Sequence, residues 1–123
     1  MKNNMNYPLI SVITVSYNAV LTIEQTILSV INQTYLNIEY IIIDGGSTDG
    51  TVNVIKKYAD KIAYWVSESD KGIYDAMNKG IAYSHGEYCN FINAGDKFCS
   101  SSILKQVMDF KSCGRYNSWS GFT

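Results

Sequence analysis

The stretch that decides the fold is Ile41-Ile42-Ile43-Asp44-Gly45-Gly46-Ser47-Thr48-Asp49-Gly50-Thr51. Three β-branched apolar residues end in a carboxylate, and glycines and small polar residues then lead into an amphipathic segment. This pattern indicates a buried parallel strand whose carboxyl end leads through a loop into a helix, and open α/β sheets bind ligands at that edge. We therefore expect Asp44 to accept hydrogen bonds from a bound molecule, and Ser47, Thr48 and Asp49 to cap the helix.

An ordinary strand-to-helix turn rich in capping residues is the alternative interpretation of this stretch. A binding loop is favoured because the same succession of strand and polar loop recurs along a short chain. The glycine spacing does not fit a dinucleotide fingerprint, since Ser47 stands where G-x-G-x-x-G requires its second glycine, and no P-loop motif is present. A nicotinamide enzyme is therefore disfavoured.

The rest of the chain alternates between strand and helix patterns. Strands are predicted at residues 9–15, 38–43, 62–66 and 87–92, and apolar residues at helical spacing follow each of them. Thr22 and Gln25 predict a capping box for the first helix, at residues 21–33, and Asp70 is predicted as the N-cap of the third. Right-handed crossovers then give an α/β fold, a mostly parallel sheet with helices on both faces, whose polar strand ends share one edge. That edge is the predicted site.

Composition limits the possible partners. With 123 residues the chain is expected to form one domain at most, and its net charge of −1 argues against nucleic acid as a partner. We expect no signal peptide and no transmembrane helix. The three cysteines have no metal-binding or disulfide spacing and are interpreted as free thiols, and the single histidine, His85, is expected at a helix end near the surface.

Four stretches resemble, in their order and spacing, the pattern of glycosyltransferase family 2. They are residues 9–18, 43–51, 70–80 and 91–96. The resemblance implies a GT-A fold, with a Rossmann-like, nucleotide-sugar-binding domain at residues 8–111 between an N-terminal arm (1–7) and an irregular tail (112–123). It also implies inverting transfer of a sugar from a nucleotide-diphospho-sugar, with UDP as the expected nucleotide, to a glycan or lipid-linked acceptor.

The resemblance assigns nucleotide-binding roles to Thr14, Ser16, Tyr17, Asp44, Ser47, Lys71 and Asn78. The tip of the first strand would hold the base, with the ring of Tyr17 stacking on it. Asp44 would accept a hydrogen bond from the base or the ribose. Lys71 and Lys79 would assist electrostatically, and Lys71 is expected to supply a phosphate contact because Met77 stands where the family often has an arginine.

The resemblance also implies a divalent cation, Mg²⁺ or Mn²⁺, held against the diphosphate. Asp96 matches the last acid of the family's D-x-D element. The other two positions of that element depart from the pattern, since they are Asn93 and Gly95. We therefore expect a single protein carboxylate, with phosphate and water oxygens completing the coordination of the metal.

Family members carry a second half that builds the acceptor site and supplies the general base. This chain is expected to contain only the donor-binding half, so no catalytic base is assigned. The alternative function is a non-catalytic nucleotide-binding or assembly module. Either function predicts an exposed half-domain face that supports a homo-oligomer. The expected location is the cytoplasm, with peripheral association at the inner face of the membrane, and the expected context is bacterial surface polysaccharide assembly.

Overall fold

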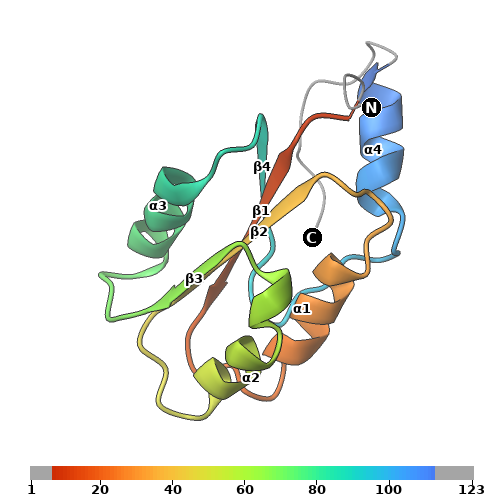
Figure 1. The fold of residues 1–123 in the computed structure, drawn as a ribbon. Helices are drawn as coiled ribbons and strands as arrows, with labels where there is room; N and C mark the ends of the chain where they lie inside the picture. The colour runs from red at the N-terminus through yellow and green to blue at the C-terminus, as the bar shows by residue number, and fades with distance from the viewer. Residues whose placement is uncertain (1–6, 113–123) are drawn as a thin grey trace.

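The computed structural model describes residues 7–112, in which strands and helices alternate (Figure 1). The elements, in chain order, are β1 (Ile10–Ser16), α1 (Ile23–Ile31), β2 (Ile38–Asp44), α2 (Thr51–Lys57), the 3-10 helix η2 (Ala59–Lys61), β3 (Tyr64–Ser67), α3 (Ile73–Tyr83), β4 (Tyr88–Phe91) and α4 (Ile103–Ser112). The predicted arm and tail lie outside the described residues, apart from Tyr7 and Ser112.

The strands form one parallel four-stranded sheet in the order β3-β2-β1-β4. The chain therefore moves outward from β1 to β3 and then returns to the other side of β1 to add β4. Such a reversal of strand order is where open α/β sheets bind ligands, beyond the carboxyl ends of the strands. The register also places Ser16, Asp44 and Ser67 in one row across the ends of β1, β2 and β3.

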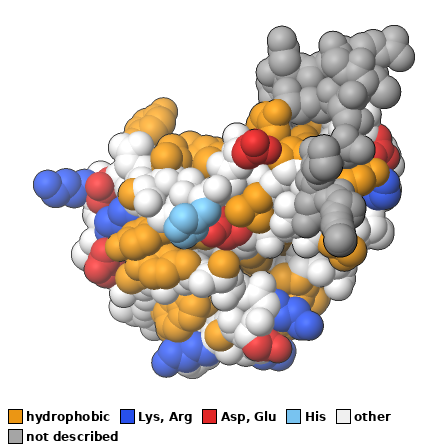
Figure 2. Space-filling view, turned by 45° about the horizontal axis from the view of Figure 1, so that its top comes forward, with side chains coloured by type: hydrophobic (Ala, Val, Ile, Leu, Met, Phe, Trp, Pro, Cys, Tyr) orange, Lys and Arg blue, Asp and Glu red, His pale blue; other side chains and the backbone are white. Residues whose placement is uncertain are grey.

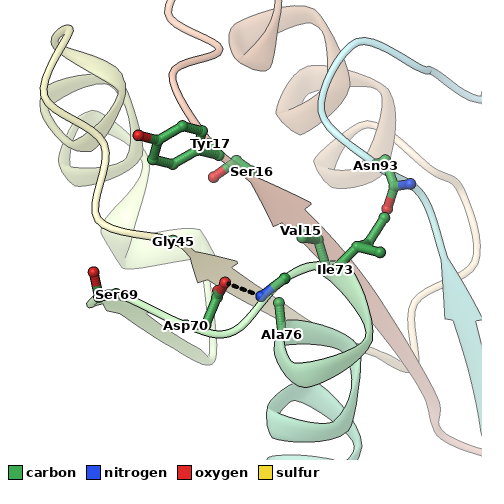
Figure 3. A pocket seen from close by; sticks show the side chains of 10 residues that line it. Val15, Ser16, Tyr17, Gly45, Ser69, Asp70, Ile73, Ala76 and Asn93 are labelled. Atoms are coloured by element: carbon green, nitrogen blue, oxygen red, sulfur yellow. Dashed lines mark hydrogen bonds between the residues drawn. The ribbon is translucent and has the colours of Figure 1, made fainter.

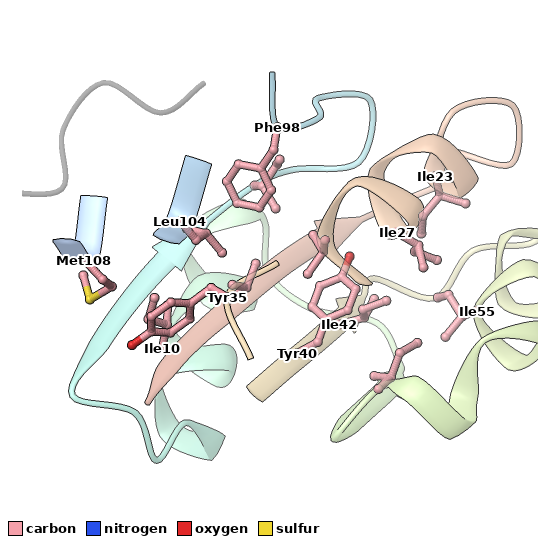
Figure 4. Packing of buried hydrophobic residues seen from close by; sticks show 14 residues of the cluster. Ile10, Ile23, Ile27, Tyr35, Tyr40, Ile42, Ile55, Phe98, Leu104 and Met108 are labelled. Carbon is pink, nitrogen blue, oxygen red and sulfur yellow. The ribbon is translucent and has the colours of Figure 1, made fainter. Parts of the chain in front are cut away.

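Helices cover both faces of the sheet, as predicted. Helices α1, α2 and α4 pack on one face, around a cluster that includes Ile10, Ile27 and Leu104 (Figure 4). Helix α3 covers the other face, where Ala76 packs against a smaller cluster containing Ile13 and the neighbouring β2 residues. Side chains of a strand alternate between its two faces, so the β-branched runs at β1 and β2 supply both clusters. The predicted α/β fold class is confirmed.

Two predicted helix caps are wrong. The hydroxyl of Thr22 makes no capping bond to α1, and α1 starts instead through a turn in which the amide of Ile23 donates to the carbonyl of Ala19 (2.8 Å). The N-cap of α3 is Gly72, not Asp70. Helix α1 also ends two residues earlier than predicted, at Ile31.

The capping prediction for the glycine-rich loop holds for one of its three residues. The N-cap of α2 is Gly50, with φ of 104°. The carboxylate of Asp49 accepts from the amide of Thr51, the first residue of α2, at 3.0 Å. Ser47 and Thr48 bond to other groups, described below.

Helix α3 also carries exposed apolar side chains. Ile73, Tyr74, Ile81 and Tyr83 are each more than two-fifths exposed. Figure 2 shows apolar side chains beside the single histidine, His85, which follows α3 and is itself exposed. Among the described residues, none of the helices has the length and apolarity needed to cross a membrane.

The close approach of α3 to β1 generates a prediction about stability. A Cβ on Gly80 would lie 2.5 Å from Cγ2 of Ile13, which is buried. Gly80→Ala should therefore lower the free energy of unfolding, because overpacking costs about 1–3 kcal/mol and exceeds the roughly 1 kcal/mol gained in helix propensity. Urea denaturation of Gly80→Ala measures this change. Asn53→Ala, on the exposed side of α2, is the control that gains propensity without a clash, and equal stability of the two variants would contradict the prediction.

Candidate functional site

The carboxylate of Asp44 is buried at the carboxyl edge of the sheet and accepts five hydrogen bonds from its own chain. Its Oδ1 accepts from the hydroxyls of Ser16 and Ser47, both at 2.7 Å. Its Oδ2 accepts from the hydroxyl of Ser67 (2.8 Å) and from the amides of Gly46 (3.2 Å) and Ser47 (2.8 Å). Asp44 therefore joins the ends of three strands to the glycine-rich loop.

A second set of bonds ties that loop to the loop after β1. The amide of Asn18 donates to the hydroxyl of Ser47 (2.7 Å), and the side-chain oxygen of Asn18 accepts from the amide of Thr48 (2.9 Å). The amide of Val20 donates to the carboxylate of Asp49 (3.2 Å). Asn18 has φ of 46°, and asparagine is one of the few residues that adopt this left-handed conformation readily. The two loops therefore form one cross-linked unit above the sheet.

The five donors also set the charge state of Asp44. Burial raises the pKa of a carboxyl, but the hydrogen bonds from Ser16, Ser47 and Ser67 outweigh burial and hold the pKa of Asp44 below its usual value. The folded protein thus favours the ionised form more than the unfolded chain does. The resulting stabilisation is present above the unfolded pKa, about 3.9, and is lost as the pH falls through the lower folded pKa.

A cleft of about 520 Å³ opens beside this unit, between the end of β1, the glycine-rich loop and the start of α3 (Figure 3). It lies on the α3 side of the sheet, because Val15, Ile73 and Ala76 line it. Its other lining residues include Ser16, Tyr17, Gly45, Asp70 and Asn93. The side chain of Tyr17 is 64% exposed, so the cleft combines an open aromatic ring with a glycine and polar side chains.

The structure brings some of the predicted nucleotide-binding residues to this cleft and not others. Ser16 and Tyr17 line it. Thr14 does not, because its side chain points into the opposite face of the sheet, where its hydroxyl bonds to that of Tyr40 (2.8 Å). Asp44 and Ser47 do not line the cleft either: Asp44 lies beneath the glycine-rich loop, and the hydroxyl of Ser47, within that loop, donates to its carboxylate.

The two predicted residues on and before α3, Lys71 and Asn78, are exposed and do not line the cleft. The amide of Lys71 donates to the carboxylate of Asp75 (2.9 Å), which fixes the turn before α3. Lys79 forms an ion pair with Glu68 at 3.1 Å. Neither predicted cation, Lys71 or Lys79, is therefore part of the cleft wall.

The predicted metal ligand, Asp96, is exposed and follows Asn93 in a turn closed by a bond from the Asp96 amide to the Asn93 carbonyl (3.0 Å). The turn is anchored to α1, where the hydroxyl of Thr26 accepts from the amide of Gly95 (3.0 Å). Gly95 has φ of 105°, which explains a glycine at a position where the family pattern has an acid.

Within residues 7–112, histidine, cysteine, aspartate and glutamate side chains do not gather in a group of three or more that could hold a metal ion. One carboxylate next to an amide side chain still fits Mg²⁺ or Mn²⁺ that arrives with a diphosphate. Such ions keep water and phosphate oxygens and use only one or two protein carboxylates. Asp96, with Asn93 beside it, is the donor set that the described chain offers.

Sequence reasoning missed Gly45 and Asp70 as residues of the cleft wall. Asp70 was expected to cap α3, but its side chain faces the cleft above Gly45. The polar run after β3 was the available signal, since it placed Asp70 at the correct edge of the sheet. His85 lies at the opposite edge, where its ring contacts Glu39 at 2.6 Å, and it takes no part in the cleft.

The bonding of Asp44 predicts a pH-dependent loss of stability in Asp44→Asn. At pH 7 this variant should lose about 1–3 kcal/mol or more, because an amide leaves some of the five donors without an acceptor. The difference from the unmodified chain should shrink as the pH falls below the unfolded pKa of about 3.9 and through the lower folded pKa, where Asp44 of the folded chain becomes protonated. Urea denaturation across this pH range measures the difference, with the exposed Asp60→Asn as the control. A difference that stays constant with pH would show that Asp44 is not ionised in the fold.

Comparisons with known proteins match this region. The sequence profile of the family described as Glycosyl transferase family 2 matches residues 11–115. An uncharacterized glycosyltransferase of Mycobacterium tuberculosis is 41% identical over 103 residues, covering 83% of this chain and 39% of the relative. The putative teichuronic acid biosynthesis glycosyltransferase TuaG of Bacillus subtilis is 38% identical over 111 residues, covering 86% of this chain and 44% of the relative.

Solved structures agree with the sequence relatives. Residues 1–349 of S. aureus TarS, in complex with UDP, superpose with a TM-score of 0.74 at 25% identity, covering 83% of this chain and 31% of that fragment. The mannosyltransferase PcManGT from Pyrobaculum calidifontis, in complex with GDP-Man and Mn²⁺, has a TM-score of 0.75 at 25% identity, covering 82% of this chain and 32% of that protein. The chain spans about two-fifths of the length of the curated relatives it matches. Its profile match, its relatives and its GT-A fold together show that the chain belongs to glycosyl transferase family 2.

Proposed function

We propose that this chain binds a nucleotide-diphospho-sugar, with UDP as the nucleotide, for inverting transfer of the sugar to a glycan or lipid-linked acceptor. The observation that carries the proposal is the cleft at the carboxyl ends of the parallel strands, where an exposed aromatic ring stands over a glycine. TarS, a structure of the same fold, was solved with UDP, and TuaG is named as a putative glycosyltransferase of teichuronic acid biosynthesis. The proposed setting is therefore bacterial polysaccharide assembly on the cytoplasmic side of the membrane.

In this proposal the base stacks on Tyr17 and the ribose lies toward Ser16. Asp44 and Ser47 act beneath the ligand, by holding the glycine-rich loop in the conformation that leaves the cleft open. Lys71 and Asn78 are exposed, and Lys71 lies between two residues of the cleft wall, Asp70 and Gly72. Both are proposed to meet the parts of the donor that extend beyond the cleft, where Lys71 can contact the diphosphate. Thr14 supports the sheet below the site through its bond to Tyr40.

Asp96 is proposed to hold Mg²⁺ or Mn²⁺ together with the oxygens of the diphosphate. The support is the position of the Asn93–Asp96 turn at the end of β4, and the Mn²⁺ in the complex of PcManGT. A divalent cation neutralises the negative charge that grows on a departing nucleoside diphosphate. Asp96 would hold the cation near the end of β4. Asn93, in the cleft wall, offers an amide oxygen as a second ligand.

The second candidate function is a nucleotide-binding or assembly module without catalysis. It is favoured by the exposed apolar side chains of α3, which suit association with another copy of the chain. No described residue has the position of a general base in the cleft, since its titratable side chains are those of Tyr17 and Asp70, on the wall assigned to the nucleotide.

The proposed function predicts metal-dependent binding of UDP. Calorimetric titration with UDP and Mn²⁺ should show binding that is at least about tenfold weaker without the metal or in Asp96→Ala, because the cation bridges the carboxylate and the phosphates. Asp60→Ala, an exposed carboxylate at the far end of the sheet, should bind like the unmodified chain. Absence of heat with UDP, with GDP and with their Mn²⁺ complexes would contradict the proposal.

The exposed apolar surface of α3 predicts self-association. Multi-angle light scattering at tens of micromolar should show a species larger than the 13.8 kDa chain. Ile81→Lys should shift that species toward the monomer, because it places a charge in the apolar surface. The exposed Leu36, away from α3, supplies the control substitution Leu36→Lys. A monomer at all concentrations would contradict an oligomer through this face.

A further inference from the structure

We propose that Thr26 is a positioning residue for the metal ligand Asp96, because its side chain fixes the backbone of the turn that carries this carboxylate. The inference rests on the proposed function, in which Asp96 holds a divalent cation against the diphosphate of the donor. Thr26 lies in helix α1 and does not line the cleft. The inference therefore adds to the site a residue that acts on the ligand only through another residue.

A single hydroxyl joins helix α1 to the turn after β4. The hydroxyl of Thr26 accepts from the amide of Gly95 (3.0 Å) and donates to the carbonyl of Asp96 (2.5 Å). On the side of the sheet, the amide of Ala94 donates to the carbonyl of Val15 in β1 (3.1 Å). The turn is therefore held by the helix as well as by the strand whose end lines the cleft.

The carboxylate of Asp96 depends on this backbone for its position. The side chain is exposed, and within residues 7–112 the hydrogen bonds of Asp96 are made by its amide and its carbonyl, not by its carboxylate. An aspartate side chain has only two torsions, so the backbone largely decides where its carboxylate lies. The neighbouring Gly95 restricts the backbone least of all residues, so the bonds to Thr26 are what hold the turn in one conformation.

The place of Thr26 in its helix supports a role outside that helix. Threonine is a weak helix former, and a hydroxyl within a helix commonly bonds to the carbonyl four residues earlier. Thr26 is fully buried, and its hydroxyl bonds to the turn instead. A group that donates and accepts at the same time must be a hydroxyl here. Valine has nearly the same shape as threonine but can make neither bond.

The following turns of α1 bind the rest of the same segment, which runs beside the helix from β4 to α4 (Figure 1). The hydroxyl of Ser29 accepts from the amide of Phe98 (3.2 Å), and the side chain of Gln33 donates to the carbonyl of Ser100 (2.7 Å). Ser29 thus anchors the segment two residues beyond Asp96 without bonding to the turn itself. It offers a matched control for Thr26.

Helix α1 is also joined to the helix that follows the glycine-rich loop. The carboxylate of Glu24 pairs with Lys57 at 2.9 Å and accepts from the hydroxyl of Tyr58, both at the end of α2. The turn that carries Asp96 and the helix after the glycine-rich loop are therefore both bonded to α1. Through Thr26, the helix fixes Asp96 relative to the loops that surround the cleft.

The test measures how Mn²⁺ changes the affinity for UDP in the unmodified chain, Thr26→Val, Thr26→Ser and Ser29→Ala. The Mn²⁺ concentration that gives half of the full effect should rise roughly tenfold in Thr26→Val, as when a partner that orients a metal ligand is removed. Binding of UDP without Mn²⁺ should not change. Thr26→Ser keeps the hydroxyl and should behave like the unmodified chain. Ser29→Ala should also keep the Mn²⁺ dependence, although it loses an anchor of the same segment.

A second measurement tests the hydrogen bonds without any ligand. Amide hydrogen exchange should show a protected Gly95 amide in the unmodified chain and in Thr26→Ser. In Thr26→Val this amide should exchange at least about tenfold faster, because it lies at an exposed residue and has lost the hydroxyl that accepts it. Thermal unfolding of each variant checks that it is folded.

The two measurements separate failure of the inference from failure of the proposed function. If Thr26→Val responds to Mn²⁺ as the unmodified chain does, or if its Gly95 amide stays protected, the inference is wrong and the proposed function stands. If Ser29→Ala needs as much Mn²⁺ as Thr26→Val, the whole segment positions Asp96, which also contradicts a specific role of Thr26. If the unmodified chain binds no UDP even with Mn²⁺, the proposed function fails and the inference fails with it.

Discussion

The buried carboxylate of Asp44 is the interaction on which the rest of the site depends. Removing a charge from water is costly, and only the five hydrogen bonds from Ser16, Gly46, Ser47 and Ser67 make it favourable here. These donors come from the ends of three strands and from the glycine-rich loop. The same bonds that stabilise the ion therefore fix the loop relative to the sheet, so the cleft above it keeps its shape without a ligand.

Two carboxylates near Gly45 thus have different tasks. Asp44 faces the α1 and α2 side of the sheet, is saturated by its own chain and holds the loop. Asp70 lies on the α3 side, keeps one oxygen free and faces the cleft. Gly45 lies between them, and it places no side chain between Tyr17 and Asp70. Asp44 therefore holds the loop, while the side chain of Asp70 lines the cleft.

The strands, their parallel direction and the edge where their polar ends gather follow from the sequence, because β-branched runs ending in polar residues have few other structures. The roles of individual residues could be predicted less well from the sequence. Thr14 points away from the cleft because alternate side chains of a strand face opposite sides, and Val15 is the one that lines it. The role of Asp70 depends on how the segment after β3 folds back over Gly45, and no periodicity encodes that path. Local caps such as Thr22 were overridden by a backbone turn at Ala19.

The central claim is that a nucleotide binds at the carboxyl edge of the sheet, on its α3 side. Titration of UDP and Mn²⁺ into the ¹⁵N-labelled chain, followed by amide chemical shifts, tests it most directly. The account predicts the largest changes at Tyr17, at Gly45 and Gly46, and at the turn from Asp70 to Gly72, with none at His85 on the opposite edge. Changes centred on Glu39 and His85, or none near Gly45 at saturating UDP, would contradict it.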